Sequence, residues 1–452
     1  MIQTAVLLDA GRGSKLWPYA QVRSKGMVPI ANVPVLGRLV EALKHIGVTD
    51  IIIVGGEHAA GARNYFRNDP TVRVIEDHGA RGAVFSLCAA KEYLTGDFLA
   101  LYGDTIMSES DLRALAQAQS LPAALVYPLR GRGNDYVTCQ ASGDHVTGFL
   151  GHPRSESGDS ACAGFAFSAE QISCLEKNSG RFTAVQVGMM PPLEGYIEMS
   201  LHDFVKDGGA VTAIRAGETV VDIDKPWHIL EADDLVRGQL CGALTENRLD
   251  TGAQIHPSAA IEGFVRLGKN SRVGRNVLIE GNVIVGDDTV IDNGAILRGH
   301  CVIGDHCTIR DGCLIDGSTV GHRCYIGHGA EFGGLLMNGA YLFHYMEISG
   351  LVGENVDFGA ATVCGSLRFD DGVTRHRTQG RLEQQHPAGD ACYVGDYCRT
   401  GVNAILMPGV KTGVYSVVGA GVTLLHDLED RTLVYSEQSQ VKKAWGPEKY
   451  GW

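Results

Sequence analysis

The first 230 residues alternate short apolar runs with segments of helical spacing. Residues 4–8, 50–54 and 98–102 are each short and apolar enough to form a buried strand. Between the first two runs, apolar residues at positions 36, 39, 40, 43 and 46 share one face of a helix that ends at Gly47. Strands that alternate with helices predict a mostly parallel sheet with helices on both faces, and ligands of such sheets bind beyond the carboxyl ends of the strands.

Beyond residue 250 the period changes to six. Apolar residues occupy every sixth position from Ile255 to Ile315, and glycine follows directly at positions 268, 274, 286 and 304. One hexapeptide supplies a short strand and a turn, and three make one coil with the apolar residues inside. The phase slips after Ile315, resumes at Val352, and is interrupted by the polar segment 366–390. The pattern predicts a parallel β-helix from which residues 366–390 project as a loop.

These two periods divide the chain. We expect an α/β domain over residues 1–228, a linker helix over 229–250, the β-helix over 251–435 and a C-terminal tail over 436–452. The helical pattern that joins the two domains extends from about Pro226 to Leu249.

Charge and composition restrict the partners. The formal net charge of −13 argues against a basic face for nucleic acid or for an anionic membrane. The N-terminal residues lack the basic and apolar regions of a signal peptide, and no apolar run of about 18 residues occurs. The twelve cysteines contain no C-x-x-C pair, so we expect reduced thiols and a cytoplasmic protein.

Three cysteines in the hexapeptide region invite a metal-site interpretation. Cys301, Cys307 and Cys313 are spaced by six residues. Positions six apart lie on three different faces of a coil, so we expect no metal or disulfide cluster there.

A glycine-rich segment, L-D-A-G-R-G-S-K-L-W-P at 8–18, directly follows the first strand. Its backbone N–H groups can hold phosphates, while Arg12, Lys15 and Lys25 would neutralise a triphosphate with a charge of about −4. A glycine loop alone also serves plain turns, and the three cations alone would suit a solvated basic loop. The combination predicts a nucleoside triphosphate site.

This loop, Tyr102-Gly103-Asp104 and the segment V-D-I-D-K-P-W at 221–227 together resemble the signature of the sugar-nucleotide pyrophosphorylases. The resemblance implies a Rossmann-like domain in which a sugar-1-phosphate attacks the α-phosphorus of a nucleoside triphosphate, with UTP or dTTP favoured. It further implies that Lys15 and Lys25 are catalytic and that Mg²⁺ is bound by Asp104 and by Asp222, which matches the pattern better than Asp224. The residues implied in nucleotide binding are Leu8, Ala10, Gly11, Arg12, Gly13, Ser14, Lys25, Gly82 and Gly103.

Several positions depart from the pattern of that family. It usually has a small residue, arginine, proline and a hydroxyl-bearing residue where this chain has Asp9, Lys15, Ser24 and Ala83. At the end that contacts the sugar, Gly151-His-Pro153 replaces E-K-P, and Cys162 replaces the asparagine of N-A-G. An acidic Asp9 suits the site only if it faces away from the phosphates or takes part in metal binding.

A second resemblance lies in the hexapeptide region. The segments G-E-N-V-D-F-G-A-A-T at 353–362 and S-L-R-F-D at 366–370 are similar to those of the archaeal bifunctional sugar-1-phosphate nucleotidylyltransferase/acetyltransferases, which are N-acetylglucosamine-1-phosphate uridylyltransferase-like. The coil also resembles left-handed hexapeptide-repeat acyltransferases. These resemblances imply a left-handed β-helix, acetyl-CoA as a co-substrate and His344 as the general base that deprotonates an amino sugar.

The implied acetyl-CoA and acceptor residues are Asp357, Ala360, Arg368, Phe369, Gly419 and Ala420. His344 lies nine residues before Gly353, where the family has ten. A packed or capping histidine is therefore the alternative interpretation. The flat faces of such coils bury well against copies, and acyl-CoA sites in this architecture lie between subunits, so we expect a homotrimer.

Three functions remain open at this point. One is a bifunctional enzyme that uses a nucleoside triphosphate, a sugar-1-phosphate and acetyl-CoA. A second keeps the nucleotidylyltransferase and treats the β-helix as a structural trimerising scaffold. The third, suggested by the departures at Lys15, Ala83, Gly151 and Cys162, is a non-catalytic regulatory protein that binds nucleotide sugars.

Overall fold

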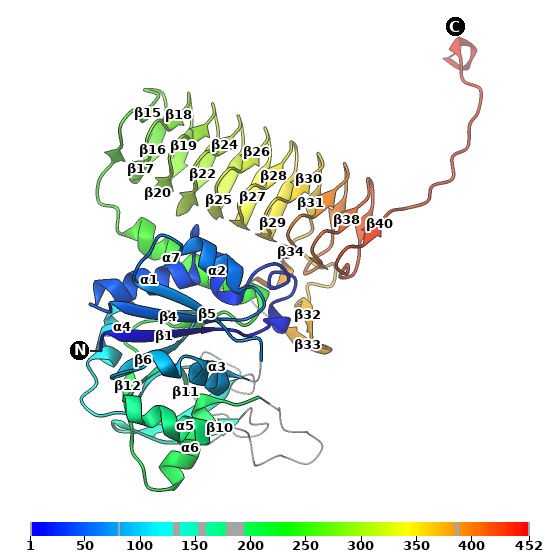
Figure 1. Ribbon diagram of the computed structural model, residues 1–452. Coiled ribbons are helices and arrows are strands. Elements are labelled where there is room, and N and C mark those ends of the chain that lie inside the picture. The colour runs from blue at the N-terminus through cyan, green and yellow to red at the C-terminus, as the bar shows by residue number, and fades with distance from the viewer. Residues whose placement is uncertain are drawn as a thin grey trace.

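The computed structural model describes residues 2–79, 82–129, 136–151, 160–177, 194–384 and 388–450. An α/β domain lies beside a long coil of stacked strands, and the C-terminal tail extends away from both (Figure 1). In the part of the chain that the structure describes, no helix combines the length and apolar character needed to span a membrane.

The α/β domain is built on a nine-stranded sheet. Its strands, in spatial order, are β5 (Val72–Glu76), β4 (Asp50–Gly55), β1 (Thr4–Asp9), β6 (Phe98–Tyr102), β11 (Ser160–Phe167), β8 (Ala123–Pro128), β12 (Val211–Arg215), β10 (His145–Gly151) and β9 (Val137–Ser142). The half from β5 to β6 is parallel, as predicted, whereas β11 runs antiparallel to both of its neighbours, β6 and β8. The sheet is therefore mixed, and its parallel half contains the three strands predicted from the sequence.

Helices cover both faces of this sheet. Alternate residues of each strand point to opposite faces, so Leu7 packs with one set of helices and Val6 with the other. The first set is α1 (Val35–His45), α4 (Glu109–Ala116) and α7 (Pro226–Gly242), and the second is α3 (Ala83–Ala89), α5 (Ile172–Lys177) and α6 (Ile197–Lys206). Helix α2 (Ala59–Tyr65) follows β4, and the short pairs β2–β3 (Pro29–Ile30, Val33–Pro34) and β7–β13 (Thr105–Ile106, Val221–Asp222) complete the domain.

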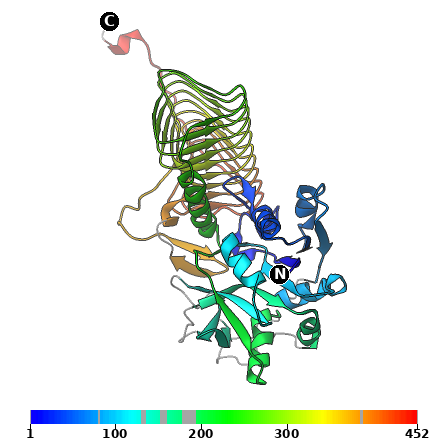
Figure 2. The ribbon, with the colours of Figure 1, turned by 90° about the vertical axis from the view of Figure 1, so that its left-hand side faces the viewer.

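The hexapeptide region forms a coil of parallel strands, which Figures 1 and 2 show as a regular stack. One face contains β15 (Gln254–Ile255), β18 (Arg272–Val273), β21 (Val290–Ile291), β24 (Thr308–Ile309), β26 (Tyr325–Ile326), β28 (Tyr341–Leu342), β30 (Asp357–Phe358), β35 (Arg399–Thr400), β38 (Val417–Val418) and β40 (Leu433–Val434). All eleven positions from Ile255 to Ile315 point into the coil, nine of them buried and the first two partly buried. The parallel β-helix is confirmed, and its hand stays a prediction.

The other two faces share one fifteen-stranded sheet, because three long strands pass from one face to the next. Its strands are β14 (Arg248–Leu249), β16 (Ala260–Glu262), β17 (Val265–Leu267), β19 (Leu278–Glu280), β20 (Val283–Val285), β22 (Ile296–Arg298), β23 (Cys301–Ile303), β25 (Leu314–Val320), β27 (Glu331–Leu336), β29 (Glu347–Val352), β31 (Val363–Cys364), β34 (Cys392–Val394), β36 (Ile405–Leu406), β37 (Lys411–Thr412) and β39 (Thr423–Leu424). As predicted, Cys301, Cys307 and Cys313 belong to three different faces and are free thiols.

The phase slip after Ile315 has a structural cause. Paired positions on one face are 18 residues apart at Ile291 and Ile309, 17 apart at Ile309 and Ile326, and 16 apart at Ile326 and Leu342. The missing residues come from one corner, which β25, β27 and β29 cross as continuous strands. Glycine is required at this corner, because a Cβ on Gly350 would lie 2.0 Å from the carbonyl oxygen of Cys392.

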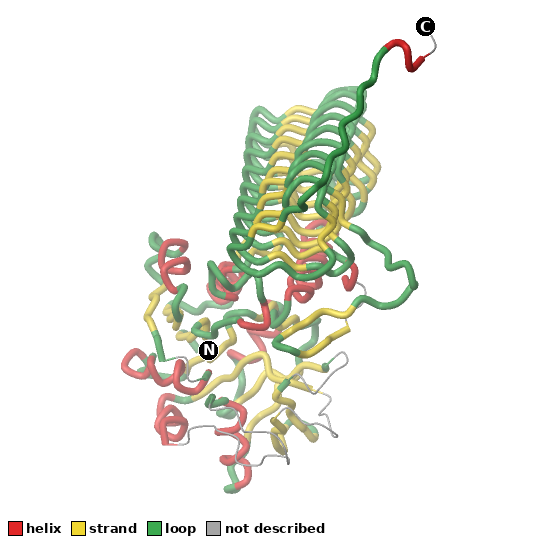
Figure 3. Tube along the Cα trace, turned by 90° about the vertical axis from the view of Figure 1, so that its right-hand side faces the viewer, coloured by secondary structure: helices red, strands yellow, loops and turns green. Residues whose placement is uncertain are grey.

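Two expectations about connecting segments were wrong. The helix from Pro226 ends at Gly242 rather than near Leu249, and residues 248–249 already form the first strand of the coil. The segment 366–390 contains more than a loop, since β32 (Arg375–Thr378) and β33 (Arg381–Gln384) pair as an antiparallel hairpin. This hairpin lies between the coil and the α/β domain (Figures 1 and 3).

The two domains share a hydrophobic core. Leu335, Leu351 and Tyr393 of the coil pack in the same cluster as Trp227 and the α1 face of the α/β domain. Asp233 of α7, which is 1% exposed, accepts hydrogen bonds from the Ala31 N–H and the Thr319 hydroxyl, both at 2.8 Å. Buried apolar and polar contacts therefore fix the coil against the α/β domain.

Candidate active site

The glycine-rich loop leaves the carboxyl end of β1 and turns sharply at Gly13. Gly13 has φ of +61°, and a Cβ there would lie 2.6 Å from Cβ of Ala20, so a side chain would meet both strain and collision. Beside Gly11 no atom lies within 4 Å of an added Cβ. The loop is tightly folded at Gly13 and open at Gly11, where a ligand could approach its backbone.

Two lysines and two aspartates meet at the ends of these strands. Lys25 Nζ lies 2.9 Å from Oδ2 of Asp104 and 3.3 Å from Oδ1 of Asp224, and Lys15 Nζ lies 2.9 Å from Oδ2 of Asp224. Asp104 follows β6, next to β1 in the sheet, and the β7–β13 pairing brings the 221–225 segment alongside. The three motifs singled out in the sequence therefore converge in one place.

The charges of this cluster depend on one another. Burial, and then the charge of Asp104, raises the pKa of Asp222 to about 8. Burial opposes ionisation of Asp224 as well, but Lys25 and Lys15 hold the pKa of Asp224 below its usual value. Burial alone would lower the pKa of Lys25, yet the nearby carboxylates raise it. The site thus holds an ionised Lys25 between carboxylates, with Asp222 as a further acid whose ionisation burial and Asp104 oppose.

Asp9, the acidic residue where a small one is usual, is buried. Its side chain is 5% exposed, and its Oδ1 accepts the Gly26 N–H at 2.9 Å. Burial raises the pKa of Asp9 to about 7. Asp9 therefore fixes the backbone next to Lys25.

Most of the remaining nucleotide-binding predictions lie on or beside the same loop. Arg12 and Ser14 are exposed, Leu8 and Ala10 are buried beneath them, and the Gly103 N–H donates to the Leu8 carbonyl at 2.9 Å. Gly82 is the N-cap residue of α3, and a Cβ on it would lie 2.3 Å from the carbonyl oxygen of Gly195.

At the end of the site where the sequence departs from its family, Cys162 is buried in β11 and Ala83 begins α3. Gly151 ends β10, while His152 and Pro153 lie outside the described residues. Glu198, which the sequence analysis missed, is 4% exposed and accepts the Tyr102 hydroxyl at 2.6 Å. Its sequence signal was a lone acid in the apolar segment 197–201 of a helix.

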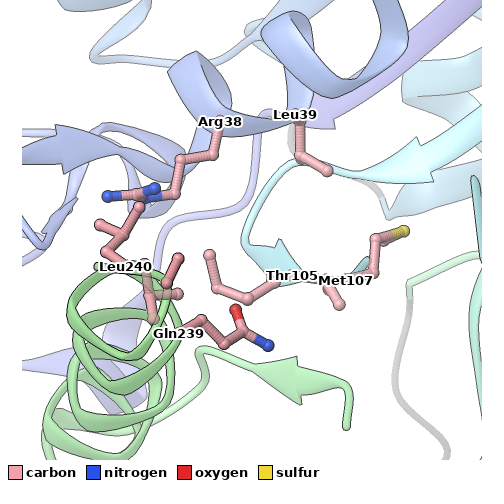
Figure 4. Close-up of a pocket in the computed structure, with 9 residues that line it drawn as sticks. Arg38, Leu39, Thr105, Met107, Gln239 and Leu240 are labelled. Atoms are coloured by element: carbon pink, nitrogen blue, oxygen red, sulfur yellow. The ribbon is translucent and has the colours of Figure 1, made fainter. Parts of the chain in front are cut away.

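A pocket lies on another side of the domain, between α1, β7 and α7 (Figure 4). Arg38, Leu39, Thr105, Met107, Gln239 and Leu240 line it. None of the residues that line it belongs to the predicted triphosphate site, although Thr105 follows Asp104 directly. We assign it no part in the chemistry below.

The predicted residues of the coil gather at one corner only in part. The strand register places His344, Ala360 and Ala420 in one column, with Asp357 and Gly419 close by. The ring of His344 stacks on that of His328 from the preceding coil, with centroids 5.0 Å apart. Arg368 and Phe369 lie outside this column in an exposed segment, where Arg368 pairs with Asp370 at 2.6 Å and Phe369 is 99% exposed.

Comparison with known proteins gives the class that this fold and loop define. Residues 5–181 match the family model of the MobA-like NTP transferase domain, and residues 245–366 match that of the GMPPB C-terminal domain. The protein is therefore an enzyme of the NTP transferase class, as the glycine-rich loop predicted.

Whole-chain relatives make the assignment more specific. The chain is 28% identical to bifunctional protein GlmU from Methanococcus maripaludis, over 97% of this chain and 98% of the relative. It is 25% identical to bifunctional protein GlmU from Methanocaldococcus jannaschii, over the same shares of both chains. It is 24% identical to a bifunctional sugar-1-phosphate nucleotidylyltransferase/acetyltransferase from Sulfurisphaera tokodaii, over 94% and 98%. The resemblance to the archaeal bifunctional enzymes is confirmed.

Proposed function

We propose that the protein joins a nucleoside triphosphate, with UTP or dTTP favoured, to a hexose- or N-acetylhexosamine-1-phosphate, releasing pyrophosphate. The observation that carries this proposal is the convergence of Lys15, Lys25, Asp104, Asp222 and Asp224 beside the glycine-rich loop. The whole-chain similarity to GlmU and to a bifunctional sugar-1-phosphate nucleotidylyltransferase/acetyltransferase supports this class of substrate.

In this proposal the residues act by position and charge. Backbone N–H groups of the loop hold the phosphates, and Arg12, Lys15 and Lys25 neutralise them. The sugar-1-phosphate oxygen attacks the α-phosphorus in line, so no covalent enzyme intermediate is needed. Binding of a triphosphate would exchange some lysine–carboxylate contacts for lysine–phosphate contacts.

The acidic residues fit Mg²⁺. Asp104 and Asp222 offer hard oxygen donors, and a divalent cation beside them would favour the ionised form of Asp222, which burial and then the charge of Asp104 oppose. Among the described residues no group of three His, Cys, Asp or Glu surrounds a point suited to a metal ion. Magnesium is commonly held by one or two carboxylates together with substrate phosphates, and it neutralises charge that develops on them.

We further propose an acetyl-CoA-dependent N-acetyltransferase site at the corner of a left-handed coil, with His344 as general base. His344, Asp357, Ala360, Gly419 and Ala420 would line it, and Arg368 and Phe369 would approach from the loop of a neighbouring copy. Exposed aromatic side chains around His344, namely Tyr341, Phe343 and Tyr345, support coverage by another subunit and thus a homotrimer. If this activity is absent, the β-helix is a structural scaffold.

One assay matrix tests both activities. Purified protein with Mg²⁺ is mixed with each nucleoside triphosphate and a panel of sugar-1-phosphates, and pyrophosphate is measured. Acetyl-CoA and amino-sugar phosphates are then supplied, and free thiol is measured. Pyrophosphate with at least one pair is the expected result; no release with any pair would contradict the proposed function.

A further inference from the structure

The β32–β33 hairpin of the coil contacts the triphosphate site of the α/β domain. It leaves the coil after β31, reaches the α/β domain, and returns at β34 (Figures 1 and 2). Its buried residues, His376, Thr378 and Glu383, face inward, whereas Arg375, Arg377 and Arg381 are exposed. A segment inserted in the β-helix is thus seated against the other domain instead of projecting into solvent.

Two hairpin contacts reach two walls of the site, namely the glycine-rich loop and the segment that follows Asp224. At the turn, the Gln379 side-chain amide donates to the hydroxyl of Ser14 in the glycine-rich loop. From β33, Glu383 forms a buried ion pair with Lys225, which directly follows Asp224. His376 adds an aromatic contact to Trp227, with ring centroids 5.0 Å apart.

These contacts close a ring that runs through the site and the hairpin. Ser14 is joined to Lys15 by the chain, Lys15 to Asp224 by an ion pair at 2.9 Å, and Asp224 to Lys225 by the chain. Glu383 and Gln379 complete the ring through the hairpin. Because both walls are tied to the same hairpin, their separation depends on a segment that belongs to the β-helix.

The loop has other ties to the coil that support the same conclusion. Trp17 Nε1 donates to Asp430 at 3.0 Å, the Tyr19 hydroxyl donates to the Leu351 carbonyl at 2.6 Å, and Arg23 pairs with Asp396. The segment from Ser14 to Arg23 is therefore held from outside its own domain. The hairpin is distinct among these ties because it contacts both walls.

We propose that the hairpin is a brace that holds the triphosphate site in its binding-competent shape, with Gln379 as a positioning residue for Ser14 and its loop. This inference rests on the proposed nucleotide binding. A pre-set loop does not have to be ordered when the ligand arrives, so the brace acts on affinity for the triphosphate more than on turnover. The β-helix then contributes to the nucleotide site and also contains the proposed acetyltransferase site.

Gln379 suits the test because its side chain is exposed at a turn, so its replacement should leave folding intact. In Gln379→Ala, loss of one neutral hydrogen bond should raise the Kd for UTP about 3- to 10-fold. We expect kcat for pyrophosphate release to change less than about 2-fold, because the substitution leaves Lys25 and Asp104 untouched. Gln379→Glu should weaken binding further through its negative charge, whereas Gln379→Lys keeps a donor and should restore affinity. The matched control is Leu382→Ala, on the same hairpin and 58% exposed.

The measurements are calorimetric titration of UTP with Mg²⁺ present, repeated with the other nucleoside triphosphates, and steady-state pyrophosphate release. Equal affinity in wild type and all Gln379 variants would overturn the proposed brace but not the proposed function. Tighter binding or faster turnover in Gln379→Ala would also overturn it, since the hairpin would then be an inhibitory cover. Failure of wild type to bind any nucleoside triphosphate would overturn the proposed function together with the brace.

Discussion

The two candidate sites differ in how much of each site one chain supplies. The triphosphate site brings Lys15, Lys25, Asp104 and Asp224 within ion-pair distance, and contacts from both domains hold its loop. At the corner of the coil, His344 stacks on another histidine among exposed aromatic rings, and Arg368 lies on an exposed segment apart from it. The first site is assembled within one chain, whereas the second has the exposure expected of a site completed by a neighbouring copy.

This difference has a physical origin. An α/β sheet gathers distant segments at the carboxyl ends of its strands, so charged residues from several loops meet. A coil instead stacks each position on its equivalent one turn away, so a column repeats one kind of environment. Convergence of unlike groups is therefore natural in the first domain, and in the second it requires an insertion or another subunit.

The largest effect that separates the sites is expected from Asp104→Asn. This change removes a charge that pairs with Lys25 and that would bind Mg²⁺, so pyrophosphate release should fall by about 1,000-fold. Thiol release from acetyl-CoA should be unchanged. The control is Asp97→Asn, an exposed aspartate just before β6, at the other end of the strand that Asp104 follows. Retention of pyrophosphate release in Asp104→Asn would remove this residue from the proposed mechanism.

A smaller effect is expected at the second site from His344→Ala. Loss of a general base should lower thiol release by about 100-fold and leave pyrophosphate release as in wild type. His328→Ala is the matched control, because His328 stacks on His344 from the preceding coil and shares its surroundings. If both variants lose the same share of activity, the two rings act through packing and neither is the base. Full activity in His344→Ala would reject His344 as the general base.

The sequence predicted the elements whose patterns are local. The period of six identified every inward position from Ile255 to Ile315, since a coil of fixed length imposes its repeat directly on the chain. Three of the four strands of the parallel half of the sheet, β1, β4 and β6, were also predicted, whereas β5 was not. The pattern failed after Ile315, where strands that cross a corner without a turn shorten the coil to 16 residues and shift the repeat.

The residues of the candidate triphosphate site lie in short motifs that the sequence displays, whereas their arrangement could not be predicted. The sequence favoured Asp222 over Asp224 as a metal ligand, although it is Asp224 that pairs with both lysines. The contact between Ser14 and Gln379 joins positions 365 residues apart, and no local pattern marks it. The polar segment 366–390 was therefore expected to be a projecting loop, because its contacts are with residues of the α/β domain that lie far away in the sequence.

The smallest of the three expected effects concerns the pH dependence of the docked hairpin. His376 lies between Trp227 and Tyr393, and its Nε2 donates to the Gly389 carbonyl at 2.7 Å. Burial, and then the charge of Lys411, lowers the pKa of His376 to about 4, although Asp427 and Asp390 act in the opposite direction.

The unfolded chain has a histidine pKa of about 6.5, so it takes up a proton at a pH where the folded protein does not. The stability that neutral His376 contributes is therefore present above pH 6.5 and is lost as the pH falls toward 4. Between pH 7.5 and pH 5 the loss should be on the order of 2 kcal/mol, since one pKa unit corresponds to about 1.4 kcal/mol.

Urea unfolding of wild type and His376→Phe at both pH values measures this loss of stability, because the other titrating groups cancel in the comparison. Phenylalanine keeps a ring between Trp227 and Tyr393 but cannot titrate, so the variant should lose less stability than wild type on acidification. The exposed His145→Phe serves as control and should follow wild type. Equal losses in wild type and His376→Phe would mean that His376 does not make hairpin docking sensitive to pH.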